Sequence, residues 1–179
     1  MALIAMTGLP GTGKSAIAQR LAQALPGLIL DKDTIRAALF PPSEIEYSTC
    51  QDDLCMQIMF QVARYILGKD PGKHVIFDGR TFSRRYQVDA FKGLALEIDV
   101  PFRIIECTCS DRVVRQRLER DIAEGHHPAA NRDYAMYLSV KARFEPIAGP
   151  KLVVNTEEDL ECCVRRCLDY VRKPRAMEG

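Results

Sequence analysis

Residues 8–15 read Gly-Leu-Pro-Gly-Thr-Gly-Lys-Ser, which is an uninterrupted GxxxxGKS pattern. The apolar run Ala2–Met6 precedes it, and the helix-like stretch Ala16–Leu25 follows it. This order of strand, loop and helix distinguishes a phosphate-binding loop from a chance match. The stretch therefore predicts that the chain binds a nucleoside triphosphate.

The fixed positions of this loop have separate physical roles. Its glycines have no Cβ, so the backbone can adopt positive φ and turn successive N–H groups toward an anion. Lys14 can place a positive charge against the β- and γ-phosphates, and the Ser15 hydroxyl can bind Mg²⁺. We expect these residues to bind the nucleotide: Gly11, Thr12, Gly13, Lys14 and Ser15.

Length and composition indicate one domain, residues 1–179, because 179 residues with 47% hydrophobic content suffice for one substantial core. The 25 Lys and Arg residues nearly balance the 24 Asp and Glu residues, so the chain has no overall basic field that would attract nucleic acid. No apolar run approaches the ~20 residues of a membrane span. The sequence gives no indication of oligomeric state.

Seven cysteines occur without a CxxC pair and without His partners at zinc-binding spacing. Together with a nucleotide site, this pattern favours reduced thiols in a cytoplasmic protein, several of them acting as small core residues.

Short apolar runs alternate with helical patterns along the chain, which is typical of a parallel sheet covered on both faces. The expected strands are Leu3–Met6, Leu28–Leu30, Val75–Phe77, Phe102–Cys107 and Leu152–Val154. The expected helices are Lys14–Leu25, Thr34–Leu39, Asp52–Leu67, Ser83–Ile98, Asp111–Glu124, Asp133–Phe144 and Glu157–Arg172. The predicted fold is α/β, a P-loop NTPase three-layer αβα sandwich with a five-stranded, mainly parallel sheet and a short helical lid.

Ligands of open parallel sheets bind outside the carboxyl ends of the strands, so residues that follow the apolar runs are candidates for chemistry. After the second run, Asp33 and Arg36 lie three residues apart on the opening turn of a helix and are neighbours on one face. Asp33 can accept a proton while Arg36 holds an anionic group of a substrate. We assign Asp31 to capping this helix.

After the third run, Asp78 follows Val-Ile-Phe directly and is placed to hold Mg²⁺ through water, as a Walker-B-type Asp does. Arg80 lies on the same rim, where it can grip a substrate anion or pair with Asp78.

The helix after the fourth run is rich in arginine. Arg117 and Arg120 lie nearest a short segment, residues 125–132, where we expect a flap. We expect both arginines to reach the ATP phosphates or to stack on the base, with the lid at about residues 117–132. His126 and His127 receive no role, and the tail after residue 172 is expected to fray.

These pieces resemble the small P-loop kinases of the polynucleotide-kinase-like group, which includes relatives of adenylylsulfate kinase and chloramphenicol phosphotransferase. The matching residues are Gly8–Ser15, Asp33-Thr34-Ile35-Arg36, Val75–Gly79 and Arg117–Arg120. The resemblance implies ATP and Mg²⁺ as cofactors, Asp33 as general base, Arg36 as a substrate contact and Arg120 as a lid arginine. Lys14, Asp33 and Arg120 are the expected catalytic residues.

The predicted function is an ATP-dependent kinase that transfers the γ-phosphoryl group to a hydroxyl of a small molecule. One alternative is a polynucleotide 5′-hydroxyl kinase, which should show a basic stripe, and Arg80, Arg84 and Arg85 are the one place where it could begin. Another is a nucleotide-dependent switch or slow ATPase that acts through a partner. The guanine-reading NKxD motif is missing, which favours ATP over GTP.

Overall fold

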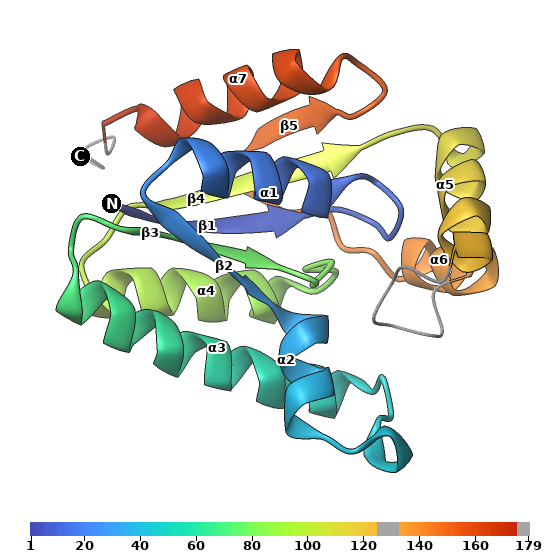
Figure 1. Cartoon of the computed structure of the whole chain (residues 1–179), viewed down its shortest axis with the longest axis horizontal. Helices are drawn as coiled ribbons and strands as arrows, with labels where there is room; N and C mark the ends of the chain where they lie inside the picture. Colours follow the sequence, from blue (N-terminus) through green and yellow to red (C-terminus); the bar gives the residue numbers. More distant parts are fainter. Residues whose placement is uncertain (125–132, 175–179) are drawn as a thin grey trace.

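A computed structural model describes residues 1–124 and 133–174 of the chain. Its five strands form one parallel sheet in the order β2-β3-β1-β4-β5 (Figure 1). The strands are Ala2–Thr7 (β1), Gly27–Asp31 (β2), His74–Asp78 (β3), Phe102–Thr108 (β4) and Leu152–Asn155 (β5). Each predicted apolar run lies within one of them, so the five-stranded parallel sheet is confirmed.

Seven α-helices surround the sheet in the described residues, as expected from the helical patterns. They are Lys14–Ala24 (α1), Lys32–Leu39 (α2), Thr49–Lys69 (α3), Arg85–Glu97 (α4), Asp111–Glu124 (α5), Tyr134–Ala142 (α6) and Leu160–Arg172 (α7). A short 3-10 helix, Pro42–Glu44, lies between α2 and α3. Across the described residues, no helix combines the length and the apolar character needed to span a membrane.

The sheet is the middle of three layers. Side chains of β1 alternate between its two faces: Leu3 and Ala5 pack into a core with α3 and α4, whereas Ile4 and Met6 pack into a core with α1 and α7. Figure 1 shows these helix pairs on opposite sides of the sheet, with α5 and α6 beyond the carboxyl ends of the strands. The predicted αβα sandwich is therefore confirmed.

Side-chain caps decide where several helices begin. The Asp31 carboxylate accepts a hydrogen bond from the Thr34 N–H at 2.7 Å, which confirms its predicted capping role for α2. Ser48 caps α3 through the Gln51 N–H, so that helix begins three residues before the predicted start at Asp52.

The segments expected to form the flap and the tail are described only in part. Residues 125–132, with His126 and His127, lie outside the described residues, so residues 117–124 of the expected lid are described and form the end of α5. After α7, the Arg103 guanidinium donates to the carbonyl of Lys173 at 2.6 Å, which ties the beginning of the tail to β4.

An aromatic cluster packs α4 against the sheet. The Phe91 ring is surrounded by four other rings within 6.3 Å, centroid to centroid, and its side chain is almost completely buried. These rings belong to Phe60, Phe77, Phe82 and Phe102. Phe91 therefore anchors the helix that begins beside the carboxyl end of β3.

We predict that Phe91→Ala lowers the free energy of unfolding by about 3–5 kcal/mol, because it leaves a cavity among the rings. Urea unfolding of the purified protein measures this change. Tyr65→Ala, at a side chain that is 70% exposed on α3, is the control and should change stability by no more than about 0.5 kcal/mol. Equal effects of the two substitutions would contradict the packing described.

Candidate functional site

The GxxxxGKS loop connects β1 to α1 at the centre of the sheet, with β3 and β4 on either side of β1. Gly8, Gly11 and Gly13 all have positive φ, at 121°, 77° and 81°. A Cβ on Gly8 would collide with the carbonyl oxygen of Cys107 on β4. The glycines thus let the loop turn tightly against the sheet, as the sequence predicted.

Lys14 begins α1 and folds back over the loop. Its Nζ donates to the carbonyls of Gly8 and Leu9, both at 2.8 Å, and the residue is buried. Gly13, the N-cap, adds no side-chain hydrogen bond at the start of α1. The first N–H groups of this helix therefore face the loop without a side-chain cap, which is the arrangement that binds phosphate.

Two cavities open beside this loop, and they share Lys14 and Ser15. One has a volume of about 430 Å³ and lies over the ends of β2 and β3. The other has a volume of about 410 Å³ and lies between the loop, α5 and the start of α7. We call them the acceptor cavity and the nucleotide cavity. The phosphate loop thus lies between two cavities.

Both arginines predicted from the arginine-rich helix line the nucleotide cavity, but Arg117 has a further role that the sequence did not reveal. Its guanidinium donates to Thr156 Oγ1 at 2.9 Å, to the Thr156 carbonyl at 2.8 Å and to the Gly11 carbonyl at 3.4 Å. Thr156 Oγ1 in turn donates to the Thr12 carbonyl at 2.9 Å. Arg117 therefore braces the phosphate loop against the segment after β5, whereas Arg120 is exposed at the cavity wall.

At the floor of the acceptor cavity lie the last residues of β2 and β3, which are paired in register as Asp31 and Asp78. The next residue, Gly79, has φ of 82°, and a Cβ there would lie 2.9 Å from both Asp31 Oδ2 and the Lys32 nitrogen. Only glycine fits this close approach of the two strand ends.

Asp78 is the carboxylate of this cavity that best fits a metal-binding role. It is buried, and its Oδ1 has no hydrogen-bond partner among the described residues. Ser15 lines the same cavity. In the described part of the chain, no group of three or more His, Cys, Asp or Glu side chains could hold a metal ion by itself. The unpaired Asp78 oxygen and the Ser15 hydroxyl fit Mg²⁺, which usually keeps waters and binds substrate phosphates besides one or two protein groups.

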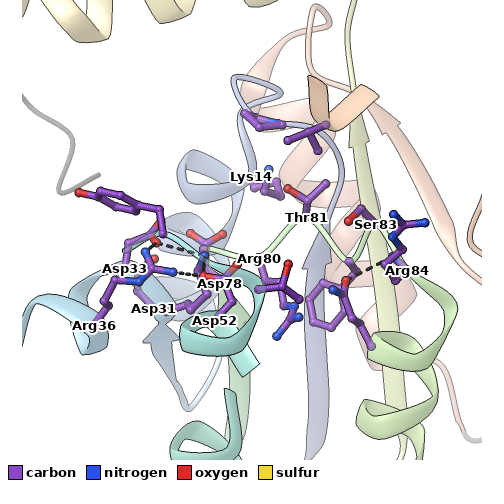
Figure 2. A pocket seen from close by; sticks show the side chains of 18 of the residues that line it. Lys14, Asp31, Asp33, Arg36, Asp52, Asp78, Arg80, Thr81, Ser83 and Arg84 are labelled. Carbon is purple, nitrogen blue, oxygen red and sulfur yellow. Dashed lines mark hydrogen bonds and ion pairs between the residues drawn. The ribbon is translucent and has the colours of Figure 1, made fainter. Parts of the chain in front are cut away.

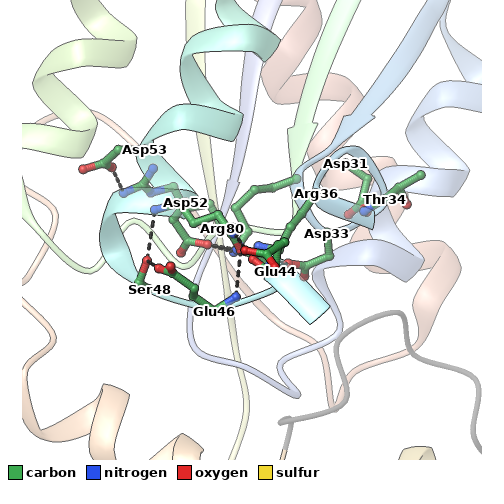
Figure 3. Close-up of polar contacts among 12 residues, drawn as sticks. Asp31, Asp33, Thr34, Arg36, Glu44, Glu46, Ser48, Asp52, Asp53 and Arg80 are labelled. Carbon is green, nitrogen blue, oxygen red and sulfur yellow. Dashed lines mark hydrogen bonds and ion pairs between the residues drawn. The ribbon is translucent and has the colours of Figure 1, made fainter. Parts of the chain in front are cut away.

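A network of ion pairs forms one wall of the acceptor cavity (Figures 2 and 3). Asp33 Oδ1 contacts Arg36 Nη1 at 2.7 Å and Lys32 Nζ at 3.2 Å. Asp52 Oδ1 contacts the same two cations, at 2.7 Å for Lys32 Nζ. Burial of Lys32 lowers its pKa, and the neighbouring Asp33 opposes that shift. The predicted pair Asp33 and Arg36 is thus brought together.

Arg80 also lines the acceptor cavity, as predicted, but its ion-pair partner is Asp53 on α3 rather than Asp78. The Tyr86 hydroxyl donates to the same carboxylate, at 3.0 Å from Oδ2. Arg80 is almost completely buried, and this contact fixes its orientation.

The sequence did not identify several residues that line this cavity, namely Lys32, Tyr47, Asp52 and Arg143, nor Asp53, the ion-pair partner of Arg80. Two adjacent carboxylates in the first turns of a helix were the available signal for Asp52 and Asp53, but their partners lie 16 or more residues away in sequence. Tyr47 has φ of 52°, and its ring faces the Arg36 guanidinium at 5.1 Å from the centroid. Nothing in the local pattern indicates that contact.

The fold of this chain is similar to several solved structures. APS kinase CysC of Mycobacterium tuberculosis, in complex with AMPPNP and APS, is 15% identical with a TM-score of 0.71, over 96% of this chain and 98% of that one. A gluconokinase from Sinorhizobium meliloti 1021 is 16% identical with a TM-score of 0.66, over 95% and 91%. The protein APE1195 is 23% identical with a TM-score of 0.73, over 96% and 94%. At these identities the likeness establishes the fold.

None of the curated proteins compared matches the chain. The family described as "AAA domain" matches residues 3–147, from the first strand through α6. This match includes the phosphate loop, both strand ends at the acceptor cavity and the arginine-rich helix. The chain therefore belongs to this AAA-domain family.

Proposed function

We propose that this protein is an ATP-dependent kinase that transfers the γ-phosphoryl group to a hydroxyl of a small molecule. The observation that carries the proposal is that two cavities meet at Lys14 and Ser15. A nucleotide in one cavity would place its terminal phosphate at the mouth of the other. A simple ATPase needs no second cavity lined by a carboxylate and several cations.

The nucleotide cavity suits the base and ribose of ATP. Gly11, Thr12, Gly13, Lys14 and Ser15 would hold the phosphates, and Arg117 and Arg120 would flank the nucleotide from α5. Arg120 is exposed and free of the brace that Arg117 makes, so it is the arginine that would approach the transferred phosphoryl group as a catalytic residue.

Ser15 and Asp78 are the groups that would hold Mg²⁺ at the phosphates. The ion would neutralise charge that develops on the phosphate oxygens during transfer. Asp78 contributes a carboxylate whose Oδ1 is buried and has no hydrogen-bond partner among the described residues.

Asp33 is the proposed general base. Both of its cationic contacts use Oδ1, which leaves Oδ2 to accept the proton of the acceptor hydroxyl. The hydroxyl oxygen would then form a bond to the γ-phosphorus as the bond from that phosphorus to the β–γ bridging oxygen breaks, releasing ADP. Arg36 holds Asp33 in place, and Lys14 stabilises the charge on the phosphates.

The polynucleotide alternative is not favoured by the charges on the rim. Arg80, Arg84 and Arg85 were the residues from which a basic stripe could begin. All three have carboxylate partners, which are Asp53, Glu145 and Asp89. Paired arginines give little field with which to attract a phosphate backbone.

We predict that Lys14→Ala weakens binding of AMPPNP and Mg²⁺ by roughly tenfold to a hundredfold and abolishes transfer, because a charge-assisted bond to phosphate is worth about 1.5–3 kcal/mol. Isothermal titration calorimetry measures the binding. Lys69→Ala, at the far end of α3, removes the same charge away from both cavities and should bind as the unchanged protein does. Equal affinity of Lys14→Ala and the unchanged protein would exclude this loop as the nucleotide site.

We predict that Asp33→Ala binds AMPPNP normally but loses roughly 10²-fold or more in transfer to the acceptor, the usual contribution of a general base. Asp33→Asn, which keeps the side-chain shape beside Arg36 and Lys32, should lose as much. The measurement is a screen with labelled ATP against sugars, nucleosides, aminoglycosides, chloramphenicol and a 5′-hydroxyl oligonucleotide.

Asp89→Ala is the matched control, because it removes an exposed carboxylate of α4 that does not line the cavity. Full transfer by Asp33→Asn would rule out the proposed base. Hydrolysis of ATP that needs no acceptor and is unchanged in Asp33→Ala would instead favour the switch or slow ATPase.

A further inference from the structure

The acceptor cavity is lined by more charge than the proposed transfer step requires. Its cationic side chains are Lys14, Lys32, Arg36, Arg80, Arg84 and Arg143. The way in which these cations are paired differs between the deep wall of the cavity and the side formed by α6. This difference bears on which acceptor the cavity would take, and so the inference rests on the proposed kinase function.

On the deep wall, every cation is bonded to a carboxylate. Lys32 and Arg36 share Asp33 and Asp52, and Arg80 contacts Asp53. These three cations and three carboxylates balance, so the wall has no excess charge with which to attract an anion. It does present hydrogen-bond donors and acceptors side by side.

Hydroxyl groups match such a wall. Each hydroxyl can donate to a carboxylate and accept from a guanidinium or ammonium group, so neighbouring hydroxyls can bridge an ion pair without disturbing its charge. The paired wall therefore suits a molecule that carries several hydroxyl groups.

Another part of the cavity lining comes from α6 and the residue that ends it. Met136, Val140 and Arg143 line the cavity at intervals of four and three residues, which places them on one helical face. Arg84, nearby, donates to Glu145 at 2.9 Å, and Glu145 also accepts from the Arg85 N–H at 2.8 Å. The Glu145 carboxylate therefore already accepts hydrogen bonds from Arg84 and Arg85.

Arg143 differs from the other cations of the cavity. Lys14 is bonded to carbonyls of the phosphate loop, and Lys32, Arg36, Arg80 and Arg84 are bonded to carboxylates. Across residues 1–124 and 133–174, the Arg143 side chain has no hydrogen bond or ion pair. Among the described residues, it is the cation of this cavity that can bind a ligand anion without first breaking an internal pair.

We propose that the acceptor is a small polyhydroxylated molecule that carries one anionic group. Its hydroxyls lie along the paired wall, one of them facing Asp33, and its anionic group is bound by Arg143. The volume of about 430 Å³, part of which receives the γ-phosphate, lies near the lower end of small-molecule sites and suits a molecule of this size.

Binding of matched probes without nucleotide tests the proposal independently of the chemistry. The probes are a series of aldonates, the alditols of the same carbon chain and configuration, the corresponding sugar phosphates, and unhydroxylated alkyl carboxylates, each titrated calorimetrically. We expect at least one aldonate or sugar phosphate to bind roughly tenfold or more tightly than its alditol, and the alkyl carboxylates not to bind. The aldonate and sugar phosphate arms distinguish a carboxylate from a phosphate as the anion.

Arg143→Gln should remove this preference, weakening the anionic probe by roughly tenfold or more, a typical worth of a charged contact, while leaving its alditol unchanged. Arg85→Gln is the matched control, since Arg85 is a nearby exposed arginine that does not line the cavity. The proposal would be overturned if alditols and anionic probes bound equally well, or if the alkyl carboxylates bound. It would also be overturned if Arg143→Gln kept the preference for the anionic probe, or if no probe bound at all.

A transfer assay with labelled ATP on the same probes separates this proposal from the kinase itself. Transfer to a neutral nucleoside or to an aminoglycoside, with no binding of the anionic probes, would leave a kinase but overturn this acceptor class. Binding of an anionic probe through Arg143 without any transfer would support the cavity's specificity and contradict the proposed kinase.

Discussion

The tight turn of the backbone between β1 and α1 is the constraint on which the rest of the structure depends. Three glycines at positive φ allow it, and Lys14 closes it by bonding to the carbonyls of Gly8 and Leu9. The turn can sit against the sheet only because its neighbours are fixed, with β4 touching Gly8 and Arg117 bracing Gly11. Preorganised N–H groups then need no rearrangement when phosphate binds.

Charge compensation is the second constraint. Taking charges out of water is costly unless each is paired and hydrogen-bonded, and breaking one such pair is strongly destabilising. The cavity follows this rule on its deep wall, where Lys32 and Arg36 share two carboxylates. It departs from the rule at Asp78, whose Oδ1 is buried and unpaired among the described residues. Such departures are informative because they mark where a ligand would complete the structure.

The local sequence pattern was sufficient to predict the strands and helices, but it was not sufficient to predict where some of them begin. Each apolar run predicted a strand because residues buried on both faces of a parallel sheet form a continuous hydrophobic run, as Ala2–Met6 do in β1. Asp31 was predicted as a cap because that role depends only on the residues that follow it. The start of α3 was missed because Ser48, which caps it, lies outside the apolar periodicity.

The sequence by itself determined the phosphate loop, the order of strands and helices, and the candidates Asp33, Arg36, Asp78 and Arg80, because all of these depend on neighbours along the chain. Only the tertiary structure decided that Asp52 and Asp53 pair with those cations, that Arg117 braces the loop through Thr156, and that Arg143 faces the same cavity. These contacts join residues distant in sequence, and the packing of α3, α5 and α6 around the strand ends brings them together. The spacing of residues along the chain does not indicate how these helices pack.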